Sequence, residues 1–185
     1  MIVPNFDDAV VVREADAEAL GWTSLSTLLL ADSNATRGAL SVMRTTIGEG
    51  TEGARPHMHT KSAELFYVLD GELQILTGNQ VIIAGKGDLV VAPPTMAHVF
   101  TTTPGHTADF LIVLAPGLER FGYFRLLERL SCGEATLEEL LASQELYDNH
   151  FLDSLSGGPP EGRAEGESSC RGIRHNRKDD RRYRL

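Results

Sequence analysis

Turn-forming residues recur at short and regular intervals between residues 65 and 117 of this chain. Asp70-Gly71, Gly78-Asn79 and Gly85-Lys86-Gly87-Asp88 separate short apolar runs, and Pro116-Gly117 follows the last run. Apolar runs bounded by such residues are typical of strands, and Asp-Gly between two runs is typical of a hairpin. Many short strands at even spacing indicate an antiparallel sandwich or barrel. We therefore expect a mainly β fold with a hairpin turn at Asp70-Gly71.

The segments on either side of these runs complete the expected fold. Residues 22–30 and 39–47 precede the runs and are predicted to be strands. After the runs, apolar residues in 118–127 recur at the spacing of a helix face. A capping-box pattern predicts a helix over 136–143, and a further short helix is expected within 146–155. No linker separates these helices from the strands, so we expect them to pack on the barrel.

Four side chains with metal-binding chemistry lie among the expected strands. His57 and His59 are two residues apart, so in an extended strand they face the same side and can reach one ion. Glu64 lies at an odd offset from His59, but a bend in the polar segment 60–63 would turn it inward. His98 opens another apolar run. Three imidazoles and one carboxylate suit a first-row divalent transition metal that keeps coordination sites free. The other histidines are expected to be ordinary core or surface residues: His106, His150 and His175.

Two segments resemble the paired sequence motifs of the cupin superfamily. Residues 53–64 contain a glycine, the His-x-His pair and the glutamate, and Gly71 closes the first motif. Residues 87–98 contain the glycine, proline and histidine of the second motif. The resemblance covers residues 38–116 and implies an antiparallel jelly-roll (cupin) β-barrel. The metal ligands that it implies are His57, His59, Glu64 and His98.

Two positions depart from the family pattern. Thr95 stands where the second motif usually has a glycine, which bears on the geometry of the turn before His98. Thr102 stands where the family often has an asparagine, at a position that ligates no metal.

The helical extension after Pro116 is similar to that of quercetin-dioxygenase-like single-domain cupins. This looser resemblance implies a metal-dependent dioxygenase that acts on an aromatic or enolic small molecule, with Fe, Mn, Ni, Co or Cu as the single metal ion. Related small cupins act as polyketide cyclases or isomerases without redox chemistry, and these would work with Zn. A binding protein without turnover is the third alternative. In the enzyme, Glu64 is the candidate general base, because its pKa would depend on the ion beside it.

Three apolar residues share the inward face with the candidate ligands. Strand parity places Phe66 and Val68 on the same side as Glu64, and Phe100 on the same side as His98. These side chains either pack in the core or line a substrate pocket, and the sequence leaves both open. A pocket of this kind would suit a flat, mostly apolar molecule with a few oxygen atoms.

Charge divides the chain into a body and a tail. Residues 157–185 hold eight basic and five acidic residues, a net charge of +3, whereas residues 1–156 carry −12. We expect the tail to be disordered, because it is rich in Gly, Ser and charge and poor in aliphatic residues. The domain is then 1–156, and its acidic character argues against nucleic acid as a partner.

The remaining expectations concern the surroundings of the protein. The N-terminal residues have no basic start and no long apolar stretch, and no apolar run approaches the length of a membrane span. We therefore expect a cytoplasmic protein without membrane contact. Residues before Ala39 could supply an edge strand that pairs with a second copy, since pairing covers an exposed edge. A homodimer is the expected assembly.

Overall fold

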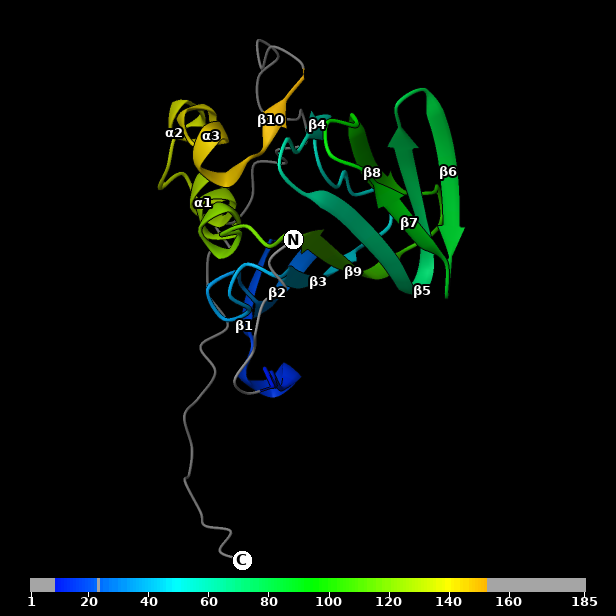
Figure 1. Cartoon of the computed structure of the whole chain (residues 1–185). Coiled ribbons are helices and arrows are strands. Elements are labelled where there is room, and N and C mark those ends of the chain that lie inside the picture. The colour runs from blue at the N-terminus through cyan, green and yellow to red at the C-terminus, as the bar shows by residue number, and fades with distance from the viewer. Residues whose placement is uncertain (1–8, 23, 153–185) are drawn as a thin grey trace, which may run out of the picture.

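The computed structural model describes residues 9–22 and 24–152 of the chain. Antiparallel strands make up most of this part, and three short helices follow them (Figure 1). The strands are β1 (Glu18–Trp22), β2 (Leu25–Ala31), β3 (Ser41–Ile47), β4 (His57–Met58), β5 (Ala63–Thr77), β6 (Gln80–Gly85), β7 (Leu89–Ala92), β8 (His98–Thr102), β9 (Ala108–Ala115) and β10 (His150–Phe151). The helices are α1 (Phe121–Ser131), α2 (Leu137–Ala142) and α3 (Gln144–Tyr147), and a 3-10 turn covers Glu14–Asp16. The prediction of a mainly β, antiparallel fold is confirmed.

Strand β5 joins the two parts of the sheet. Its first half pairs with β7 and β9, and its second half pairs with β6 and β8. Between the halves the register shifts after Val68, and Gly71 has a φ of +75°. A Cβ atom at Gly71 would lie 2.0 Å from the carbonyl oxygen of Thr107, so only glycine fits. The chain bends at Asp70-Gly71 without reversing, and the predicted hairpin at this position is wrong.

The other strands extend from β5 in two directions. The paired strands follow the order β1-β2-β3-β9-β5-β8-β4-β10, while β6 and β7 each pair with β5. Within the described residues this path does not close on itself, so the jelly-roll barrel stays a prediction. The predicted strand at 22–30 corresponds to β2, whereas Trp22 ends β1. The predicted strand at 39–47 corresponds to β3.

Side chains on the inner faces of the strands form the main core. Burial alternates along β2, β3 and β9, as expected for strands with one face turned inward. Phe66, Phe100 and Phe110 lie at its centre, with ring centroids 5.4 to 6.3 Å apart in tilted or edge-to-face pairs. Burial of these rings removes a large apolar surface from water, and their pairing adds to the stability.

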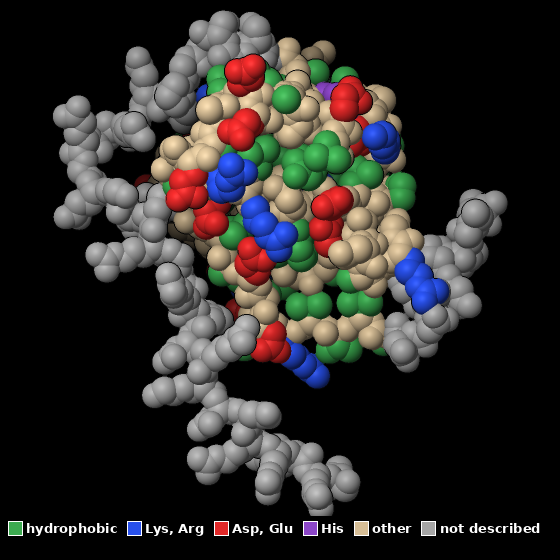
Figure 2. All heavy atoms as spheres, turned by 90° about the vertical axis from the view of Figure 1, so that its left-hand side faces the viewer, with side chains coloured by type: hydrophobic (Ala, Val, Ile, Leu, Met, Phe, Trp, Pro, Cys, Tyr) green, Lys and Arg blue, Asp and Glu red, His purple; other side chains and the backbone are tan. Residues whose placement is uncertain are grey.

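The helices pack on the core, as expected from the sequence. Phe121 and Phe124 of α1 contact the main core, and Arg125 forms an ion pair with Glu18 of β1 at 2.5 Å. The helices also share a smaller apolar cluster, and charges of both signs are scattered over this side of the molecule (Figure 2). None of the helices in the described part of the chain has the length and apolar character of a transmembrane helix.

The predicted helical extension is correct in outline and wrong at its end. Helix α2 begins after the expected capping box, in which the side chains of Thr136 and Glu139 each bond the other residue's backbone N–H. The last helix, α3, ends at Tyr147, because Asp148 adopts a left-handed conformation with a φ of +49°. Residues 150–151 then form a strand instead of continuing a helix. The predicted tail, residues 157–185, lies outside the described residues.

Candidate metal centre

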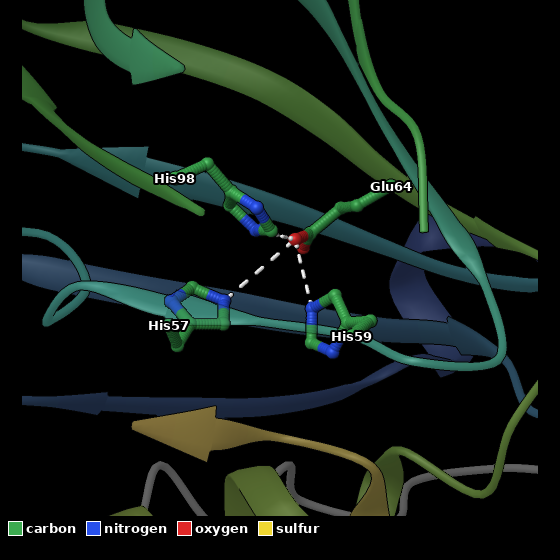
Figure 3. Close-up of side chains that lie close together, drawn as sticks. All are labelled: His57, His59, Glu64 and His98. Atoms are coloured by element: carbon green, nitrogen blue, oxygen red, sulfur yellow. Dashed lines mark hydrogen bonds and ion pairs between the residues drawn. The ribbon is translucent and has the colours of Figure 1, made fainter. Parts of the chain in front are cut away.

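Three strand segments bring the four predicted ligands together. His57 lies on β4, His59 follows it, Glu64 lies on β5 and His98 begins β8 (Figure 3). Strand β4 pairs with β8 so that His57 and His98 are direct neighbours. The bend between β4 and β5 turns Glu64 inward, as the polar segment 60–63 predicts. All four side chains are buried, and their potential ligand atoms lie within 4.8 Å of one another.

One oxygen atom of Glu64 is the point on which the three rings converge. Its Oε2 lies 2.6 Å from Nε2 of His98, 3.0 Å from Nε2 of His59 and 3.7 Å from Nε2 of His57 (Figure 3). Each histidine therefore directs the same ring nitrogen, Nε2, toward the centre.

The opposite nitrogen of each ring, Nδ1, contacts a backbone carbonyl oxygen. The acceptors are Arg55 for His57, Asp148 for His59 and Met96 for His98, at 2.7, 2.5 and 2.9 Å. A carbonyl oxygen can only accept a hydrogen bond, so each Nδ1 must carry the proton. In the neutral ring Nε2 then presents a lone pair. Three lone pairs and a carboxylate that face one point form a donor set for a cation, and such carbonyl contacts are typical around metal-binding histidines. The residues fit a single divalent metal ion.

The charges at the centre keep Glu64 ready as an anionic ligand. Burial alone would raise the pKa of its carboxyl group, but the electrostatic effect of His59 and the contacts with the three imidazole rings hold this pKa well below its usual value. Burial lowers the pKa of His57. For His98, burial also acts to lower the pKa, but the Glu64 hydrogen bond outweighs it and raises the pKa. Glu64 is therefore ionised at neutral pH.

Asp148 is a residue at this centre that the sequence reasoning missed. Its carbonyl oxygen receives Nδ1 of His59, and its buried carboxylate fixes the loop after that histidine. The donors to the carboxylate are the backbone N–H groups of Thr60 and Lys61, the Thr60 hydroxyl and Nε2 of His150, at 2.5 to 3.1 Å. Burial alone would raise the pKa of Asp148, but the hydrogen bonds from Thr60, Lys61 and His150 lower it. Asp148 thus orients His59 in two ways: its carbonyl oxygen contacts the ring directly, and its carboxylate holds the loop that follows His59.

The helical extension also adds a strand beside the ligands. Strand β10 pairs with β4, with Phe151 opposite His57 and His150 opposite Met58 (Figure 1). No sequence motif marks this contact, because the two segments are about ninety residues apart. The only local signal was an aspartate where a short helix ends, since Asp tolerates positive φ better than most residues.

Thr95 shows how the departure from the family pattern is accommodated. It adopts a φ of +68°, and its N–H donates to the carbonyl oxygen of His59 at 2.7 Å. The turn thus forms with threonine where the family usually has glycine. A β-branched residue in this left-handed region is strained.

We predict that Thr95→Gly stabilises the protein by about 1 kcal/mol, because glycine adopts positive φ without steric cost. Thermal unfolding should show a higher Tm. The matched control is Thr46→Gly, at an exposed position within β3, which should lower the Tm instead. An unchanged or lower Tm of Thr95→Gly would show that the turn stores no strain.

The three residues predicted as pocket lining are buried near the centre. Phe66, Val68 and Phe100 belong to the main core, and the Phe66 ring lies 6.0 Å from the His98 ring. Their burial confirms that they share the inward face with Glu64 and His98. Contact with a substrate stays a prediction for all three.

Neither of the other two described histidines belongs to the cluster of four candidate ligands. The His106 side chain is half exposed, with Nε2 3.9 Å from Glu72, and His150 contacts the Asp148 carboxylate. That neither residue binds the metal stays a prediction. His175 lies outside the described residues.

Comparisons with known proteins find one family model and several solved structures that are similar to this chain. Residues 43–114 match the family model described as a cupin domain. Among solved structures, KdgF from a Halomonas species is 15% identical, with a TM-score of 0.51 over 59% of this chain and 94% of that one. A predicted oxalate decarboxylase from Thermotoga maritima is 19% identical, with a TM-score of 0.52 over 57% of this chain and 98% of that one.

A third similar structure is Streptomyces Pac13, described as a nucleoside dehydratase. It is 14% identical, with a TM-score of 0.50 over 62% of this chain and 88% of that one. Identities this low show the fold alone. No curated protein matches the sequence. The stretch that matches the cupin domain model, residues 43–114, includes all four candidate ligands, and the fold is similar to that of these solved structures.

Proposed function

We propose that this protein is a metal-dependent cupin enzyme with one divalent ion held by His57, His59, Glu64 and His98. The observation that carries the proposal is the convergence of three Nε2 atoms on Glu64 while every Nδ1 contacts a carbonyl oxygen. The candidates are Fe, Mn, Ni, Co, Cu and Zn, since imidazole and carboxylate ligands suit all of them. Which of these metals occupies the site depends on their availability in the cell.

We propose further that the enzyme is a quercetinase-like dioxygenase with an aromatic or enolic substrate. A bound metal would supply Lewis acidity and a template for a substrate oxygen. Glu64 accepts the proton that such a substrate releases, because it is the ionised carboxylate at the centre of the site. Phe66, Val68 and Phe100 provide the apolar surroundings that exclude water and favour a flat ligand.

An experiment on protein purified without added metal tests this proposal. Elemental analysis is expected to find one transition metal ion per chain, and an oxygen electrode should record uptake with a flavonol or another enolic substrate. His57→Ala and Glu64→Ala should abolish the uptake, whereas His106→Ala should leave it unchanged. Metal-loaded protein that consumes no oxygen with any such substrate would contradict the dioxygenase.

A second candidate is a non-redox cyclase or isomerase with the same metal site. The similar fold of Pac13, described as a nucleoside dehydratase, favours it, since dehydration needs no oxidant. This candidate predicts turnover without oxygen and full activity with zinc alone. Tight retention of a small molecule without product would instead indicate a binding protein.

We propose that the fold closes as a jelly-roll barrel and that two copies pair. Among residues 9–22 and 24–152, strand β1 pairs with β2 alone, and apolar side chains are exposed on β6 and β7. These side chains are Val81, Ile83, Leu89 and Val91. Contact between two copies would cover them. Light scattering should give the mass of a dimer, and a monomeric mass would reject the pairing.

A further inference from the structure

Arg120 is a buried cation that lacks a carboxylate partner. It lies just before α1 and is only 2% exposed. Its Nη1 donates to the carbonyl oxygen of Tyr147 at 2.9 Å, and its guanidinium carbon lies 4.5 Å from the centre of the Tyr123 ring. Asp32 accepts the backbone N–H of Arg120 rather than the side chain. None of the carboxylates that the structure describes forms an ion pair with this guanidinium. Buried charges are normally paired, so this one calls for a partner.

Two hydrogen-bond donors at this position have no acceptor among the residues that the structure describes. They are Nε of Arg120 and Nδ2 of Asn149, and both atoms are buried. Nε and Nη2 form one edge of the guanidinium, the edge that holds a carboxylate through two parallel hydrogen bonds. Within the described part of the chain, the one hydrogen bond along this edge is a long one, 3.4 Å from Nη2 to Oδ1 of Asn149. Because both unpartnered groups donate, the missing partner is an acceptor.

The two donors are connected to the metal centre through Asp148. Asn149 follows Asp148, whose carbonyl oxygen receives Nδ1 of His59. Burial raises the pKa of Tyr123 to about 12, and the charge of Glu64 also acts to raise it. Tyr123, whose ring contacts the Arg120 guanidinium, therefore stays a neutral phenol and supplies no negative charge to it.

We propose that the Nε/Nη2 edge of Arg120 and the side-chain amide of Asn149 bind the carboxylate or enolate oxygen of a small organic anion. A water molecule would satisfy the two donors but leave the buried charge uncompensated, whereas an anion does both. Glu64 does not serve as the counter-ion, because its Oε2 is shared by the three histidines. This anion site rests on the proposed function, because the anion is the substrate of the proposed metal-dependent enzyme. The site narrows the substrate class of that enzyme to acidic aromatic or enolic molecules.

Calorimetric titration of the full chain with benzoate tests the site, on both metal-free and zinc-loaded protein. Wild type should bind benzoate and show a higher Tm in its presence. Arg120→Lys keeps the charge but removes the two-pronged edge, and should weaken binding at least about tenfold. Arg125→Lys is the matched control, because Arg125 is half exposed and pairs with Glu18, and it should bind like wild type.

Asn149→Asp provides a readout that a purely structural role would not give. It keeps the shape of the side chain and places a carboxylate beside Arg120, so it should abolish benzoate binding and raise the Tm of the ligand-free protein. If Arg120→Lys fails to fold, Asn149→Asp alone tests whether the anion site exists. Zinc affinity should stay near that of wild type in Arg120→Lys.

Two results would overturn the anion site. One is equal benzoate affinity in wild type, Arg120→Lys and Asn149→Asp, and the other is zinc-binding wild type that does not bind benzoate at tens of millimolar. A further result distinguishes the anion site from the proposed metal-dependent enzyme. Benzoate binding that depends on Arg120, in protein that binds no transition metal, would retain the anion site and reject the metal-dependent enzyme.

Discussion

Replacing His98 by alanine is expected to lower the affinity for a divalent transition metal by more than ~100-fold, since removal of a direct ligand should exceed the loss seen on removing an outer partner. The imidazole of His98 lies closest to Glu64, at 2.6 Å, and alanine leaves the carboxylate without that partner. Elemental analysis should find metal-depleted protein, and titration against a chromophoric chelator should give the change in affinity.

His106→Ala is the matched control for this prediction. It removes an imidazole that is half exposed and outside the centre, so it should retain the metal content of wild type. Full metal occupancy and unchanged affinity in His98→Ala would show that the four side chains do not act as one site.

Replacing Asp148 by asparagine is expected to weaken metal binding by about 10- to 100-fold, although this side chain contacts no metal ligand. Asparagine tolerates the left-handed backbone, so the change removes mainly the negative charge and one acceptor. The loop at Thr60 and Lys61 then loses hydrogen bonds, and the carbonyl oxygen that orients His59 is no longer held. The Tm should fall as well. Chelator competition and thermal unfolding provide the two measurements.

Asp70→Asn is the matched control: it tests whether the loss of metal affinity and Tm is specific to position 148. Asp70 is exposed and pairs with Lys86, so its replacement should change neither metal affinity nor Tm appreciably. Asp148→Asn protein with the metal affinity of wild type would reject the role of Asp148 in positioning His59.

The same carboxylate predicts a pH dependence of stability. The pKa of Asp148 is lower in the folded protein than its ordinary value of 3.8. Its contribution to stability is therefore fully present above the ordinary pKa and is lost as the pH falls through the lower, folded value. In metal-free protein the Tm difference between wild type and Asp148→Asn should shrink below about pH 4. A difference that does not change with pH would show that the ionised carboxylate is not what stabilises the loop.

The ligand set could be predicted from sequence because it depends on local geometry. The two-residue spacing of His57 and His59 fixes a shared face in any extended strand, and the polar segment before Glu64 indicated the bend that reverses its direction. The burial of Phe66 and Phe100 follows from the same parity. These inferences need only the backbone period of a strand, which tertiary contacts do not change.

What sequence reasoning missed depends on contacts between distant segments or on the use of a flexible residue. Asp70-Gly71 predicted a hairpin, but the positive φ of Gly71 serves a bend within one long strand instead. Asp148 and Arg120 lie in no recognisable motif. Their roles come from packing of the helical extension against strands that precede it by many residues, and a lone aspartate or arginine is ordinarily a surface residue.

The carbonyl contact between Asp148 and His59 has a consequence for where this protein can be cut. The match to the cupin domain ends at residue 114, which would make a truncation there look harmless. Such a fragment keeps all four candidate ligands. It loses the Asp148 carbonyl oxygen, which orients the His59 ring, and it loses β10, which pairs with β4. The smallest unit that can be grafted into another scaffold with its coordination sphere intact therefore extends at least to Phe151.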